Sequence, residues 1–114
     1  MTVLEPNTLV HALAVDVAHK PVPADQSLRG EPSTGTQPLA DFDGLEVGIW
    51  EMTPGMMTDV EVEELFIVLS GSATIEFVDG SPSLAVGPGD VVRLASGTET
   101  IWTVTETLRK IYLA

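Results

Sequence analysis

Four carboxylates lie close together in the middle of the chain, at Asp59, Glu61, Glu63 and Glu64. On a β-strand the first three would share one face and Glu64 would lie on the other, because successive side chains alternate. Three carboxylates on one face repel one another unless water or a hard cation such as Ca²⁺ or Mg²⁺ separates them. We interpret these three as a solvated loop or edge that discourages edge-to-edge pairing, which leaves Glu64 to be considered separately.

Aromatic residues are few, and most of them follow the same alternation. Thr100 and Trp102 share a face in one segment, Glu64 and Phe66 share a face in another, and Tyr112 falls near the C-terminus. Aromatic walls with one or two polar groups describe a small-molecule pocket. The same pattern describes an ordinary barrel core, so both interpretations stay open.

Lys110 lies on the same face as Tyr112 in the last segment of the chain. A lysine opposite Glu64 would neutralise a carboxylate that otherwise costs several kcal/mol to bury or takes a raised pKa. It could also hold the carboxylate of a ligand. Alternatively, Lys110 is exposed and only offsets the acidic surface.

Few other residues offer chemistry. The chain has no cysteine, which excludes disulfides, thiolate metal sites and cysteine nucleophiles. Its two histidines, His11 and His19, lie in the first twenty residues, where we expect them to be exposed to solvent. The turn at Gly87-Pro88-Gly89 is not a phosphate loop, because the lysine and helix of such a site do not follow it.

The composition describes one acidic globular domain. The chain has 114 residues, 44% of them hydrophobic, and a net charge of −12. Between Arg29 and Arg93 there are twelve acidic residues and no basic one. Such a surface repels phosphate backbones and anionic lipids, so nucleic acid and membrane partners are not expected. No apolar run approaches the ~20 residues that cross a bilayer, and the N-terminus lacks the basic start of a signal peptide. We expect a cytoplasmic protein.

Prolines divide the chain into two parts. Residues 1–40 contain five prolines and are predicted to form an N-terminal arm. Over 8–20, Leu13, Val15 and Val17 alternate as in a strand, while Leu9, Leu13 and Val17 also fit a helical face, and we favour the strand. Residues 21–40 are predicted to form an extended arm or loop, with one short strand at most. Residues 41–114 show short alternating segments separated by Gly-rich turns such as Asp79-Gly80. This pattern predicts an all-β sandwich or barrel. The expected strands are 45–50, 64–70, 73–77, 84–86, 91–95, 99–104 and 107–113.

Two motifs in this second part resemble the cupin superfamily. Glu64 followed by six residues and Gly71 fits the second half of the first cupin motif, and Gly89 to Thr100 fits the second motif with Ala95 in place of proline. Three further strings, 48–55, 87–90 and 102–112, are similar to small cupins related to ureidoglycine aminohydrolase domains. The resemblance implies an RmlC-like jelly roll, the double-stranded β-helix, which is often dimeric.

The histidines that bind metal in cupins are missing. The motif places the first two at Thr58 and Val60 or at Met57 and Asp59, and the third at Thr100. Glu64 alone occupies a ligand position. Transition-metal chemistry needs several donors around one ion, so the resemblance implies a pocket that Glu64 and Thr100 face, with Trp102 beside them, and that holds no metal.

These observations predict an uncharacterised cupin with a metal-independent pocket for a small nitrogenous or carboxylate metabolite. If the protein is an enzyme, Glu64 is the proton-transfer group. No cofactor is expected, although a divalent metal stays open: one alternative is a metalloenzyme with an oxygen-rich site at Glu64 and Asp59. Another is a non-catalytic dimeric binding or regulatory module, and a homodimer is expected. The predicted pocket residues are Trp50, Phe66, Thr100, Trp102, Lys110 and Tyr112.

Overall fold

The computed structural model describes residues 3–114 and shows a single sheet of nine strands over that range, with no helix. The all-β prediction is therefore confirmed. Since the described residues contain no helix, none of them forms a helix long and apolar enough to cross a membrane. The strands are β1 (Lys20–Pro21), β2 (Ser27–Arg29), β3 (Ser33–Phe42), β4 (Leu45–Met52), β5 (Gly55–Val60), β6 (Glu64–Phe77), β7 (Leu84–Val86), β8 (Val91–Leu94) and β9 (Glu99–Leu113).

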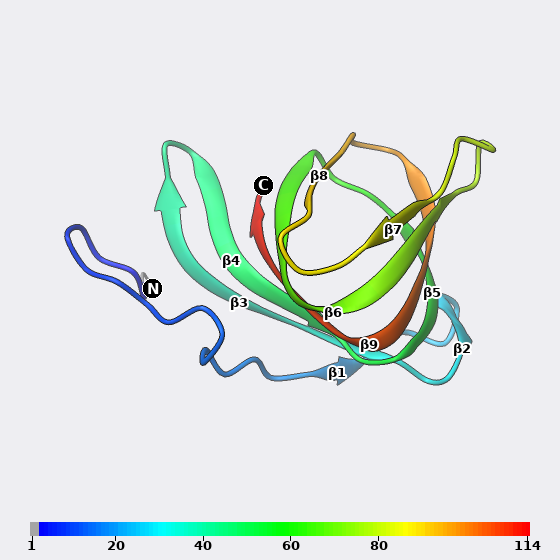
Figure 1. Ribbon diagram of the computed structural model, residues 1–114, viewed down its shortest axis with the longest axis horizontal. Helices are drawn as coiled ribbons and strands as arrows, with labels where there is room; N and C mark the ends of the chain where they lie inside the picture. The colour runs from blue at the N-terminus through cyan, green and yellow to red at the C-terminus, as the bar shows by residue number, and fades with distance from the viewer. Residues whose placement is uncertain (1–2) are drawn as a thin grey trace.

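Two long strands, β6 and β9, form the centre of the molecule. They pair antiparallel along most of their length. The second half of β9 also pairs with β4, and its first half pairs with β5. At the far side of β6, β7 and β8 pair with its two ends. The sheet curls on itself around an enclosed interior (Figure 1).

Alternation determines which side chains face that interior. Along β9, the even-numbered residues from Thr100 to Tyr112 are buried except at the bend around Glu106. In β6 the buried residues change from even to odd numbers between Val68 and Ala73, because the register shifts there. Gly71 lies at this bulge with φ +87°, and a Cβ on it would collide with the backbone of β9.

The core is made by the inward residues of six strands. It packs around Trp102 and Phe66, both at most 1% exposed, and around aliphatic and methionine side chains from β4 to β9, with Val22 from the segment before β2. The buried polar or charged residues in the described part of the chain are Glu61, Thr100 and Lys110. The fold therefore places a small polar site against an apolar core.

The N-terminal segment departs from the prediction. Residues 8–19 form no strand, and Leu9 and Leu13 are 74% and 67% exposed. The Arg109 guanidinium holds this segment instead, by donating hydrogen bonds to the carbonyl oxygens of Ala12 (2.6 Å) and Val15 (2.7 Å). The segment then runs along the outside of β3 (Figure 1). The predicted strand over 8–20 is wrong.

Strand boundaries after residue 20 also differ from the prediction. The boundary drawn at residue 40 falls inside β3, a ten-residue strand that pairs with β4. The segments 64–70 and 73–77 form one strand, as do 99–104 and 107–113, because bulges bend these strands without ending them. Strand β5 was not predicted.

Candidate functional site

A cavity of about 330 Å³ lies beside these buried polar residues. Its walls come from β3, β4, β5, β6 and β9 and from the loop between β5 and β6. The volume lies at the lower end of the range for ligand pockets, about 300–1,000 Å³. The residues that line it include Trp50, Asp59, Glu61, Glu64, Trp102, Lys110 and Tyr112.

A buried ion pair between Lys110 and Glu64 crosses the inner end of the cavity. Lys110 Nζ lies 2.7 Å from Glu64 Oε2, and the two side chains are 4% and 9% exposed. They come from neighbouring strands, β9 and β6, where Lys110 is paired with Val68. Burial lowers the pKa of the Lys110 ammonium, and the Glu64 carboxylate opposes that shift.

Three aromatic rings surround the same ammonium group. Lys110 Nζ lies 4.1 Å from the ring centroid of Phe66, 4.4 Å from that of Trp50 and 4.9 Å from that of Trp102. Cation–π attraction at these distances favours the charged lysine. The rings also pack against each other, with Trp102 5.5 Å from Trp50 and 5.8 Å from Phe66. The ammonium group is thus held by one carboxylate and three aromatic rings.

Glu61 is a second buried carboxylate in the cavity wall, only 6% exposed. Its Oε2 accepts hydrogen bonds from the Thr100 hydroxyl at 2.6 Å and from the Trp102 indole N–H at 2.9 Å. The backbone of Glu61 is bound to the turn before β9, through Thr98 and Gly97. The loop is therefore pinned to β9, with the Glu61 carboxylate facing inward.

Asp59 completes the acidic side of the cavity. It is partly buried, and its Oδ1 accepts a hydrogen bond from the Val60 amide at 2.8 Å. Desolvation and the nearby Glu61 carboxylate raise the pKa of Asp59 from 3.8 to about 6, while the Val60 amide and Lys110 act in the opposite direction. With a pKa of about 6, Asp59 changes charge slightly below neutral pH.

This pKa shift predicts how stability depends on pH. A carboxyl whose pKa is raised from 3.8 to about 6 by folding stabilises the fold below pH 3.8, and the contribution is lost as the pH rises through 6. The asparagine of Asp59→Asn never ionises, so we expect the free energy of unfolding of this variant to be higher than that of the wild type above pH 6. The expected difference is about 1–2 kcal/mol, because solvent screens part of the effect at this half-buried site. Urea unfolding at several pH values measures this. A difference that is the same at low and high pH would contradict the assignment.

Tyr112 lines the rim of the cavity. Its hydroxyl donates a hydrogen bond of 2.7 Å to Glu46 Oε2, and burial together with this bond raises the pKa of the phenol. The ring lies over Gly48 of β4, where a Cβ would collide with it. Glycine at this position therefore allows the tyrosine to reach across the strand.

The structure brings most of the predicted site residues to one place. Trp50, Glu64, Trp102, Lys110 and Tyr112 line the cavity, whereas Phe66 and Thr100 lie behind its wall. The contact between Lys110 and Glu64 is the neutralising arrangement that the sequence left open. A catalytic role for Glu64 stays a prediction.

The prediction that Asp59, Glu61 and Glu63 share a solvated face is wrong. Asp59 lies at the end of β5, Glu61 is buried in the loop, and Glu63 points outward to Arg93 at 3.0 Å. Sequence reasoning therefore missed Glu61. The signal that could have found it is the pair of inward donors, Thr100 and Trp102, which need a buried acceptor.

The residues at the metal positions of the cupin motif do not fit a transition-metal ion. In the part of the chain described, no three His, Cys, Asp or Glu side chains are grouped so that they could hold a metal. The one carboxylate in a ligand position, Glu64, contacts the Lys110 ammonium, which occupies the place of a cation. We therefore derive no chemistry through a metal.

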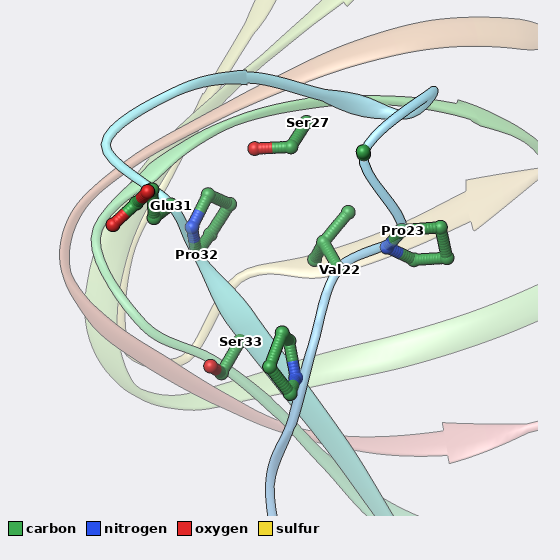
Figure 2. A pocket seen from close by; sticks show the side chains of 8 residues that line it. Val22, Pro23, Ser27, Glu31, Pro32 and Ser33 are labelled. Carbon is green, nitrogen blue, oxygen red and sulfur yellow. The ribbon is translucent and has the colours of Figure 1, made fainter.

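A larger hollow, of about 730 Å³, is lined by residues between 21 and 33, in the N-terminal segment up to the start of β3. Figure 2 shows it lined by Val22 and prolines, with Ser27, Glu31 and Ser33 at its edge. Glu31 is its one charged residue. His19, elsewhere in this segment, is paired with Glu51 at 2.8 Å. Since neither feature joins several reactive groups, the barrel cavity is the better candidate site.

The curled antiparallel sheet and its cavity define a cupin barrel, and comparison with known proteins agrees. A model of the EutQ-like cupin domain matches residues 40–112, and the chain belongs to this family. The cupin prediction is confirmed, while the narrower relation to ureidoglycine aminohydrolase domains stays a prediction. No protein with a curated description matches the chain.

Solved structures show the same fold. A protein of unknown function from Pseudomonas syringae pv. tomato is 26% identical with a TM-score of 0.75, over 88% of this chain and 44% of the other. This chain thus spans less than half of that protein. A protein of unknown function from Acidithiobacillus ferrooxidans is 21% identical with a TM-score of 0.62, over 96% and 97% of the two chains. The EutQ protein of Clostridium difficile is 21% identical with a TM-score of 0.60, over 72% and 61%.

Proposed function

We propose that this cupin uses its barrel cavity as a metal-independent binding site for a small polar molecule. The buried pair of Lys110 and Glu64, which closes the inner end of the cavity, is the observation that carries the proposal. Trp50 and Trp102 form an aromatic wall beside it. A cavity with an apolar wall and a few fixed polar groups is the usual form of a ligand site.

Stability alone is a weak reason for such a pair. Desolvation of two charges offsets most of their attraction, and apolar residues of similar volume often serve a fold equally well. The pair nevertheless lines a cavity, next to a core of apolar side chains. We infer that these charges are placed there to contact a ligand.

The chain offers a specific reporter for this site. Its two tryptophans, Trp50 and Trp102, both line the cavity, so indole emission reports on this region alone. We expect at least one compound from a panel of small amines, alcohols and carboxylates to change this emission and to raise the melting temperature, as a ligand of the folded state must. The variant Glu64→Gln should bind that compound at least tenfold more weakly.

Glu63→Gln is the matched control. It removes the same charge from the adjacent residue, whose side chain is 58% exposed and lies outside the cavity. Each variant is compared with its own ligand-free melting temperature, so a loss of stability is separated from a loss of binding. A panel that changes neither emission nor melting temperature of the wild type would overturn the proposal. If Glu64→Gln binds the compound as tightly as the wild type does, Glu64 does not contribute to the binding site.

A further inference from the structure

The charges around the cavity do not balance. Four carboxylate side chains line it, those of Glu46, Asp59, Glu61 and Glu64, and Lys110 is the one basic residue among the lining residues. Glu46 accepts a hydrogen bond from the Tyr112 hydroxyl. That lysine is already paired with Glu64 at 2.7 Å. Glu61 and Asp59 therefore face the cavity without a cationic side chain of their own.

From this charge excess, together with the aromatic wall, we infer that the cavity binds a small organic cation, a compound with a protonated amine, and selects it over neutral and anionic compounds of the same size. The inference names the ligand class for the binding site proposed above and rests on that proposal. The amine would lie between Glu61 and Asp59, with its carbon chain against Trp50.

The hydrogen bonds of Glu61 leave room for such a ligand. Both hydrogen bonds that its carboxylate accepts fall on Oε2, from Thr100 and Trp102. The side chain lines the cavity, so Oε1 is an acceptor at its wall. An ammonium group carries three N–H donors, and a charged donor on a carboxylate gives a stronger hydrogen bond than a neutral one.

The other ligand classes fit less well. An anion in the cavity would share it with the carboxylates of Asp59 and Glu61, and would compete with Glu64 for Lys110. A divalent ion such as Ca²⁺ or Mg²⁺ is surrounded by about six or more oxygen donors. The carboxylates of Asp59 and Glu61, which are not paired with Lys110, supply too few. The net charge of −12 also attracts cations to the protein and repels anions.

Three compounds with one carbon chain test this selection: butylamine, butanol and butyrate. Each is titrated into the wild-type protein at neutral pH while indole emission and melting temperature are followed. We expect butylamine to bind at least tenfold more tightly than butanol, and butyrate to have no effect.

Tighter binding of butanol or butyrate than of butylamine overturns the inference and leaves a small-molecule site in place. No response to any of the three, where other panel compounds respond, overturns the inference as well. No response to any compound overturns both proposals.

Variants locate the amine within the cavity. Glu61→Gln keeps an acceptor oxygen for Thr100 and Trp102 but removes the charge. It should weaken the binding of butylamine about tenfold and leave the binding of butanol unchanged. Asp59→Asn provides an independent test if Glu61→Gln does not fold, with the same expected direction. Glu63→Gln, outside the cavity, should bind butylamine as the wild type does. If all three variants weaken butylamine binding equally, the overall charge of the protein alone attracts the amine. That result would overturn the placement of the amine between Glu61 and Asp59.

Discussion

Lys110→Met is expected to lower the free energy of unfolding by about 3–5 kcal/mol. The substitution leaves the Glu64 carboxylate buried without its partner, which is 2.7 Å away in the wild type. It also removes the ammonium that three aromatic rings surround. Urea unfolding at neutral pH, followed by circular dichroism, measures the change.

The loss should depend on pH and on the partner. As the pH falls, Glu64 in the variant takes up a proton and the penalty for its burial disappears, so the difference from the wild type should shrink. The double variant with Glu64→Leu should be more stable than Lys110→Met alone, because no unpaired charge remains. A double-mutant cycle on the two positions then gives their coupling.

Arg93→Met is the control for this prediction. It breaks the exposed pair of Arg93 with Glu63, whose side chains are 78% and 58% exposed. Exposed pairs of this kind contribute about 0–1 kcal/mol. If Lys110→Met costs no more than Arg93→Met, the buried pair does not contribute to the fold as argued.

Local sequence signals predicted the part of the fold that depends on alternation and turns. Gly71, Gly80 and Gly89 do take the positive φ that bends and turns require, and the inward face of β9 follows from the position of Thr100 in the cupin motif. Strand ends were less well predicted, because a bulge and a turn look alike in sequence. The bulges at Gly71 and around Glu106 bend strands β6 and β9 without ending them.

Two strand errors have a clear physical origin. Pro38 argued against more than a short strand before residue 40, but the register of β3 shifts between Pro38 and Ala40, where the loss of an N–H is tolerated. The alternation of Leu13, Val15 and Val17 predicted a strand that has no partner to pair with. Its backbone instead binds Arg109, nearly a hundred residues away along the chain, and no local pattern contains that contact.

The site was predictable where strand alternation applies and not where the chain leaves the sheet. The faces of Glu64, Trp102 and Lys110 follow from their places in β6 and β9. Glu61 lies in the loop between β5 and β6, so its direction depends on the contact of this loop with the turn at Gly97. The four neighbouring carboxylates look equivalent in the sequence, and only the structure separates the buried Glu61 from the exposed Glu63.

Glu61→Ala is expected to lower the free energy of unfolding by about 2–4 kcal/mol, since it removes the acceptor of two buried donors. These donors are the Thr100 hydroxyl and the Trp102 indole N–H, on residues that are each 1% exposed. Trp102 also donates to Thr100 Oγ1 at 3.1 Å, which preserves part of the interaction. Urea unfolding and the position of the indole emission maximum report the change.

Glu61→Gln separates the acceptor from the charge. The amide oxygen can accept the same two hydrogen bonds, so we expect the glutamine variant to lie within about 1 kcal/mol of the wild type. Equal stability of the alanine and glutamine variants would contradict this, and would mean that water in the cavity replaces the carboxylate. If glutamine preserves the fold but loses the preference for amines, the charge at position 61 is there for a ligand, because the fold needs only an oxygen acceptor.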